Sequence, residues 1–211
     1  MNWYKTAKEK EVKDEDLQDY QSFGWTSIDV PKIVIDKIKE IQKTIDPRDL
    51  FRKKEGDWTY GLEDDFHITV KWGIVTKDPE EVKKAVKGFH GGEVQLYKID
   101  LFENDEYDVL KINADSDALS ELNKGIDDKL ETEDSHPTYN PHVTIAYIKS
   151  GRGKKYTSAK FEKIKFSFDE VRFEDSDDKL TVIPIEKYKK ASPENSITQP
   201  FMRSMPYNKG R

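Results

Sequence analysis

The chain has 211 residues, enough for one domain of ordinary size or for one domain built from two lobes. It contains no cysteine, which excludes disulfides, thiolate zinc sites and cysteine nucleophiles. The net charge of −6, from 42 acidic and 36 basic residues, argues against a protein that holds long nucleic acid by neutralising its phosphates. A small anionic ligand in a local basic pocket remains compatible with this charge.

The two ends of the chain differ in character from its middle. Residues 1–20 carry alternating charges and few large apolar residues, and their positive charges precede no apolar core of the kind a secretory signal has. No apolar run approaches the ~18–20 residues that cross a bilayer. We therefore expect a peripheral segment at 1–20, one domain at 21–188 and an extended tail at 189–211. The expected location is the cytoplasm, without membrane, and the sequence does not indicate an oligomeric state.

The first half of the domain alternates strands and helices. The stretch FGWTSIDVP at 23–31 reads as a strand, and its Asp29 and Pro31 are typical of a helix start. Apolar side chains then recur at spacings of three and four along one helical face, at Val34, Ile38, Ile41 and Ile45. A strand is predicted over 57–74 and a second helix over 79–89.

The second half repeats this alternation. Two strands are predicted at 94–102 and 107–113, joined by a hairpin turn with the sequence ENDE. A third helix (116–130), a strand (141–148) and three further strands (163–168, 170–175 and 179–185) follow. This order predicts an α+β fold: a bilobal duplicated unit with two antiparallel sheets, flanked by helices, around a central cleft.

A His-x-Thr motif occurs twice, in FHITVKWG at 66–73 and in PHVTIAYI at 141–148. Side chains two positions apart share one face of a strand, so His67 and Thr69 point one way, as do His142 and Thr144. The opposite faces are predicted to point into the core, with Phe66, Ile68, Val70 and Trp72 in the first strand and Val143, Ile145 and Tyr147 in the second. If the two lobes face each other, four polar groups converge.

These four groups suit a reaction at phosphorus. Imidazole, with an unperturbed pKa of ~6.5, can accept or donate a proton near neutrality. One imidazole can deprotonate an attacking oxygen while the other protonates the leaving oxygen, and hydroxyls can stabilise the charge on non-bridging oxygens. A single His-x-Thr in a strand is usually packing or chance, but its repetition favours catalysis. His136 and Asp134 lie near His142 without metal-ligand spacing, so we expect no metal and no cofactor.

The doubled motif resembles that of the two-histidine phosphoesterase superfamily, which includes 2′-5′ RNA ligase-like enzymes and cyclic phosphodiesterases. The resemblance covers roughly residues 23–185. The segments YGLEDDFHITVKWG and TYNPHVTIAYIKSGRGKKY are most similar to the phage anti-CBASS nucleases, which cleave cyclic oligonucleotide messengers of bacterial antiphage defence. In this chain Phe66 stands where proline often precedes the first histidine. The resemblance implies that His67, Thr69, His142 and Thr144 form the catalytic set.

Further residues are candidates for binding a substrate. Lys71 is predicted on the His67 face, and a basic loop follows the second motif with Lys149, Arg152, Lys154 and Lys155. Aromatic side chains that could stack on a base are Trp25, Trp58, Tyr60, Tyr97 and Tyr139. Glu170 could contact a purine edge. Solvated surface and core packing are the alternative interpretations of these residues.

Three functions follow from this sequence. The first is a metal-independent phosphodiesterase whose partner is a cyclic di- or trinucleotide, acting in the host cytoplasm if the chain is encoded by a phage. The second is an enzyme that opens 2′,3′-cyclic phosphates on RNA ends or handles 2′-5′ linkages. The third is a sponge that binds cyclic nucleotides without cleaving them. Two positioned proton carriers favour the enzymes over the sponge, and the acidic charge favours a small substrate.

Overall fold

The computed structural model describes residues 23–52, 61–133 and 138–187. The predicted N-terminal segment and tail lie outside these ranges, as do Trp58, Tyr60 and His136. The elements in chain order are β1 (Gly24–Asp29), α2 (Lys32–Gln42), β2 (His67–Ile74), α3 (Pro79–Val86), β3 (Gly92–Phe102), β4 (Tyr107–Asp115), α4 (Asp117–Asp127), β5 (His142–Lys149), the 3₁₀ helix η3 (Lys154–Ser158), β6 (Ile164–Phe168), β7 (Glu170–Glu174) and β8 (Leu180–Pro184).

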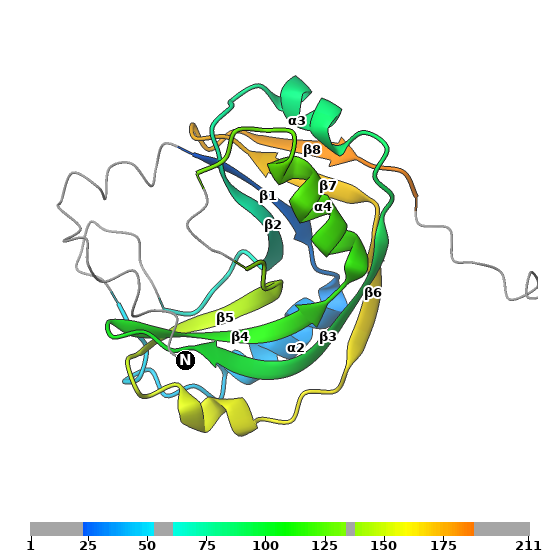
Figure 1. Ribbon diagram of the computed structural model, residues 1–211. Helices are drawn as coiled ribbons and strands as arrows, with labels where there is room; N and C mark the ends of the chain where they lie inside the picture. The colour runs from blue at the N-terminus through cyan, green and yellow to red at the C-terminus, as the bar shows by residue number, and fades with distance from the viewer. Residues whose placement is uncertain (1–22, 53–60, 134–137, 188–211) are drawn as a thin grey trace, which may run out of the picture.

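The strands form two four-stranded sheets, in the orders β2-β1-β7-β8 and β5-β4-β3-β6. Every pair of neighbours is antiparallel, which confirms the predicted α+β fold with two antiparallel sheets. The two His-x-Thr strands, β2 and β5, are edge strands of different sheets and contact each other where the sheets meet (Figure 1). The topology thus brings the two motifs into one region of the molecule.

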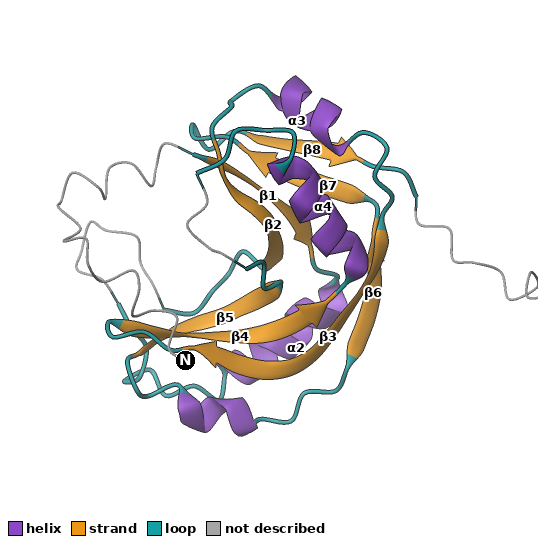
Figure 2. Cartoon of the chain, viewed as in Figure 1, coloured by secondary structure: helices purple, strands orange, loops and turns teal. Residues whose placement is uncertain are grey.

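A strand-helix-strand unit occurs twice, as β1-α2-β2 and as β4-α4-β5. In each unit the two strands pair with each other, but the helix between them reaches the other sheet. Helix α2 packs on β5, while α4 packs on β2 and also on β3 (Figure 2). The helices therefore cross between the sheets and join the two lobes.

Two of the helices begin at side chains that cap them. Asp78 accepts a hydrogen bond from the Glu80 amide and is followed by Pro79 in the first turn of α3. Ser116 accepts one from the Leu119 amide at the start of α4. All three helices end about three residues earlier than the apolar pattern predicts, because Ile45, Phe89 and Leu130 pack on the core from the following turns.

None of the described helices combines the length and the apolar character needed to cross a bilayer.

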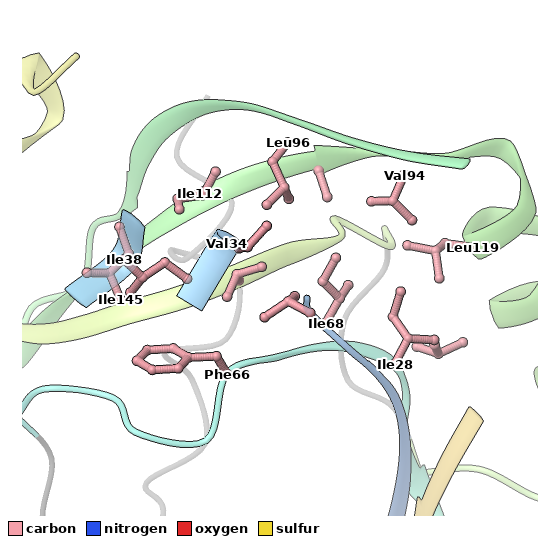
Figure 3. Close-up of a cluster of buried hydrophobic side chains, with 14 of the residues drawn as sticks. Ile28, Val34, Ile38, Phe66, Ile68, Val94, Leu96, Ile112, Leu119 and Ile145 are labelled. Carbon is pink, nitrogen blue, oxygen red and sulfur yellow. The ribbon is translucent and has the colours of Figure 1, made fainter. Parts of the chain in front are cut away.

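One hydrophobic core fills the space between the sheets and the crossing helices. Ile28, Ile68, Leu96 and Ile112 from the strands are fully buried, as is Leu119 of α4. Figure 3 shows these side chains together with those of α2 and β5. Each fully buried aliphatic side chain contributes roughly 1.5–3 kcal/mol. Because β2 and β5 turn one face into this core, their other faces carry the motifs.

Candidate active site

The structure confirms the predicted alternation within both motifs. Ile68 and Val143 are fully buried, whereas the histidines and threonines on either side of them are only partly buried. The His67 side chain keeps 22% of its surface exposed. Each motif strand thus presents an imidazole and a hydroxyl on the face opposite the core.

Each motif strand then carries a bulge directly after the threonine. Val70 has no partner in the register between β1 and β2, and Ile145 has none in the register between β4 and β5. In each strand the bulge residue and the one after it, Lys71 or Ala146, are both buried. A bulge shifts the alternation of side chains by one residue, so the faces exchange from this point on.

This shift overturns three predictions of side-chain direction. Lys71 does not share the face of His67: it is 5% exposed, and its ammonium pairs with Asp127 of α4 at 2.7 Å. Trp72 and Tyr147 do not belong to the core but are partly exposed. Instead, Trp72 contacts Phe23, and Tyr147 contacts Tyr107.

Both histidines are held in the same way by the backbone. Nδ1 of His67 lies 2.8 Å from the Asp65 carbonyl oxygen, and Nδ1 of His142 lies 2.7 Å from the Asn140 carbonyl oxygen. A carbonyl oxygen only accepts hydrogen bonds, so Nδ1 carries the proton in both rings. The other nitrogen, Nε2, is then the one that exchanges a proton with a ligand.

An aromatic ring from another strand of the same sheet lies beside each imidazole. The Trp25 ring of β1 lies 4.7 Å from that of His67, at a tilt of 41°. The Phe102 ring at the end of β3 meets that of His142 edge-on at 4.9 Å. Such packing limits the rotation of each imidazole, so the direction of Nε2 is defined.

A charged cluster surrounds His67. The Asp65 carboxylate lies 3.3 Å from Nδ1 of His67, and Arg172 of β7 pairs with Asp65 at 3.2 Å and with Asp29 at 2.9 Å. The hydrogen bond to His67, helped by the charges of His67 and Arg172, lowers the pKa of Asp65 to about 2. Asp65 is therefore a carboxylate at neutral pH, and it lies between His67 and Arg172.

A buried lysine lies beside the other motif. Lys111 of β4 is the cross-strand partner of Thr144 and is 4% exposed. Its ammonium donates to Asn113 and lies 4.1 Å from the centre of the Phe102 ring. Burial lowers the pKa of Lys111. This ammonium adds a positive charge on the side of His142.

Tyr139 connects the two motifs directly. Its hydroxyl donates to the Thr69 carbonyl oxygen at 2.9 Å, although Tyr139 lies in the segment that leads into β5. The ring packs on the core, and burial raises the pKa of the hydroxyl. Tyr139 thus links the lead-in to β5 with β2, in line with the core-packing interpretation of this side chain.

Tyr97 and Glu170, two other residues predicted to bind a substrate, are both exposed on strands outside the motifs. Tyr97 is 38% exposed and precedes Lys98 on β3. Lys98 pairs with Asn113 of β4, and Asn113 pairs with His142 of β5, so Tyr97 lies two strands away from His142. Glu170 is exposed on β7 and alternates with buried Val171.

The basic loop is not gathered around the second motif. Lys149 lies seven residues along β5 from His142, about 23 Å at ~3.3 Å per residue. Its ammonium donates to the Arg48 carbonyl oxygen at 2.8 Å. Lys155 pairs with Asp49 at 2.5 Å, and this carboxylate also accepts from the Tyr156 hydroxyl. These two lysines serve to fix the loop to the segment after α2.

A separate hollow of about 1100 Å³ opens beside the end of α3 and the start of α4. Its rim includes His90, whose ring lies 3.4 Å from the Glu186 carboxylate, but none of the four motif residues. Among the described residues, the lining of this hollow includes no second histidine, so the hollow does not reproduce the paired imidazoles of the motif strands. Within residues 23–52, 61–133 and 138–187, no group of three or more His, Asp or Glu side chains is arranged to hold a metal ion.

Comparison with protein-family models finds no match to this chain, and comparison with curated protein sequences finds none either. Among solved structures, the chain is similar to TT0787 of Thermus thermophilus, with 12% identity, a TM-score of 0.49, and coverage of 72% of this chain and 86% of the other. It is also similar to Escherichia coli LigT complexed with 3′-AMP, with 14% identity, a TM-score of 0.47, and coverage of 78% and 95%. A protein described as a phosphoesterase is similar at 12% identity and a TM-score of 0.46, with coverage of 78% and 95%.

Proposed function

We propose that the chain is a phosphodiesterase that uses two imidazoles and no metal ion. The observation that carries this proposal is the matched state of His67 and His142. Each ring has Nδ1 bound to a backbone carbonyl, an aromatic ring beside it and a threonine hydroxyl two residues further on. Two such groups on contacting strands suit the simultaneous removal and delivery of a proton at one phosphodiester.

One imidazole would remove the proton from the attacking oxygen, and the other would donate its proton to the leaving oxygen. The attacking group would be a ribose 2′-hydroxyl or a water molecule. As the P–O bond to the leaving oxygen breaks, the new P–O bond forms on the opposite side.

The threonines would stabilise the charge that builds up on phosphorus. Thr69 and Thr144 lie on the same face as the histidines, where their hydroxyls can donate to the non-bridging oxygens. Lys111, paired across the strands with Thr144, would add its positive charge to this stabilisation.

We infer that the substrate is a cyclic di- or trinucleotide with a 3′-5′ linkage. The similarity of the two motif segments to anti-CBASS nucleases supports this, as does the acidic chain, which suits a small substrate better than long RNA. If a phage encodes the chain, the reaction would remove the messenger that activates bacterial immunity. Partly exposed aromatic side chains such as Trp25 and Tyr97 are available for base contacts.

The mechanism is tested by turnover in EDTA with the wild type and the variants His67→Ala and His142→Ala. Loss of either proton carrier should lower kcat by roughly 10²–10⁴-fold. His90→Ala is the matched control, because His90 is a largely exposed histidine outside the motifs. Wild-type turnover in either motif variant, or loss of turnover in EDTA, would refute the two-imidazole mechanism.

The substrate class is tested by product analysis with cyclic dinucleotides, cyclic trinucleotides and RNA that ends in a 2′,3′-cyclic phosphate. Linear products from the cyclic oligonucleotides alone support the proposal. Products from the RNA alone assign the chain to the RNA-end reaction instead. A cyclic nucleotide that is bound and recovered intact identifies a sponge.

A further inference from the structure

Each crossing helix sends one side-chain amide to the bulge of the motif strand that it covers. Asn123 of α4 donates from Nδ2 to the Val70 carbonyl oxygen of β2 at 2.7 Å. Gln42 at the end of α2 donates from Nε2 to the Ile145 carbonyl oxygen of β5 at 2.9 Å. Gln42 also donates to the Glu63 carbonyl oxygen at 2.6 Å. The two amides thus bind equivalent carbonyl groups, one in each motif strand.

The carbonyl groups that receive these amides belong to the residues that create the bulges. Val70 and Ile145 have no cross-strand partner in the sheet registers and directly follow Thr69 and Thr144. The Ile145 carbonyl also accepts a hydrogen bond from the Glu63 amide at 3.0 Å. The Gln42 side chain and the Ile145 carbonyl are therefore both bound to the backbone of Glu63. If a bulge moved one residue back towards its motif, Thr69 or Thr144 would become the unpaired residue, and the residue after it would take the threonine's place on that face of the strand.

We propose that Asn123 and Gln42 are positioning residues, each of which holds the bulge after one His-x-Thr motif and thereby fixes the direction of that motif's imidazole and hydroxyl. The proposal rests on the proposed phosphodiester cleavage for its kinetic consequence, but its structural part is independent of the reaction. Asn123 acts on His67 and Thr69, whereas Gln42 acts on His142 and Thr144. No local sequence pattern marks this role, because each amide is 53 or 103 positions away in the chain from the carbonyl that it holds.

The effect of the variants on the two imidazoles distinguishes a positioning role of Asn123 and Gln42 from a role in stability alone. If the amides only attached the helices to the sheets, their removal would lower the free energy of unfolding and leave the folded fraction with unchanged histidines. If they position the bulges, each variant disturbs one motif and spares the other. This selectivity can be measured on the imidazoles themselves, with or without substrate.

The experiment uses the full chain with Asn123→Leu and with Gln42→Leu, which keep much of the side-chain volume but cannot donate. Asn123→Asp and Gln42→Glu serve as second variants, because they keep the shape and lose the amide donor. Matched controls are Ser120→Ala on α4 and Thr44→Ala after α2, whose hydroxyls donate only to backbone carbonyls near them in sequence. Imidazole ¹⁵N–¹H correlation spectra of the four histidines are recorded for each protein, and kcat and KM are measured with a 3′-5′-linked cyclic diadenylate.

We expect the Asn123 variants to shift the His67 signals and leave those of His142 in place, and the Gln42 variants to do the reverse. We expect kcat to fall by about 10–100-fold, with KM within about threefold, because a misplaced catalytic group costs about this much. Imidazole signals equal to the controls, or equal changes in both rings, would overturn the proposal. If the wild type cleaves no diadenylate, this dinucleotide is not a substrate, while the spectra still decide whether the amides position the rings.

Discussion

Replacement of Tyr139 by phenylalanine isolates the contact that connects the two motifs. The ring keeps its place against the core, so no cavity forms, and only the hydroxyl that donates to the Thr69 carbonyl at 2.9 Å is lost. Because burial raises the pKa of this hydroxyl, it keeps its proton and donates throughout the neutral range. The lost hydrogen bond and the carbonyl left without its donor together cost about 1–3 kcal/mol.

This cost should appear as a lower midpoint in urea unfolding, followed by far-UV circular dichroism, with an unchanged m value. Tyr97→Phe is the control, because this partly exposed tyrosine lies on β3, and its change should stay within about 0.5 kcal/mol. Turnover should also fall in Tyr139→Phe, since Tyr139 holds the lead-in to His142 against β2. A free energy of unfolding equal to that of Tyr97→Phe would refute the idea that this bond joins the two motif strands.

Two further predictions concern pH and backbone conformation. The pKa of Asp65, about 2, lies below its ordinary 3.8, so its stabilising effect is present above about pH 4 and is lost as the pH falls towards 2. Asp65→Asn should therefore show a smaller loss of unfolding free energy between about pH 5 and pH 2 than the wild type, and an equal loss would contradict the pairing with His67. Gly73 has φ +80°, and an added Cβ would lie 2.6 Å from the Glu133 carbonyl oxygen, whereas Gly88 has φ +86° with nothing within 4 Å. Gly88→Ala should cost about 1–2 kcal/mol in urea unfolding and Gly73→Ala more, so equal costs would contradict the close approach at Gly73.

The sequence was sufficient to predict the three helices, most of the strands and the chemical face of the motif strands. The strand predicted over 57–74 was wrong for residues 61–66, because β2 begins only at His67, and the 3₁₀ helix at Lys154–Ser158 was not predicted. Period-two alternation around Ile68 and Val143 is local, and so are the capping residues that start the helices. The bulges were not predictable, because a bulge is defined by the strand opposite, and no pattern within HITVKWG marks where its pairing slips. This is why Lys71 was placed on the wrong face.

The surroundings of the histidines depend on segments that are distant in the chain. Asp65 stands two residues before His67 and could have been recognised from the sequence EDDFH. Arg172, Phe102 and Lys111 could not, since only the strand order brings them beside the motifs. The basic loop was predicted to bind a substrate from its composition alone, which does not show where its lysines point. In the structure, Lys155 pairs with the Asp49 carboxylate.

The exchange of helices between the sheets makes the two lobes inseparable in folding. A cut in the turn at 103–106 would leave each sheet with strands from both fragments, since β1 pairs with β7 and β3 pairs with β4. Neither fragment alone would contain a complete four-stranded sheet. We therefore expect both fragments to be inactive alone and to regain activity only when they are mixed. An ancestor with a single strand-helix-strand unit would meet the same need by pairing with a second copy, each copy lending its helix to the other.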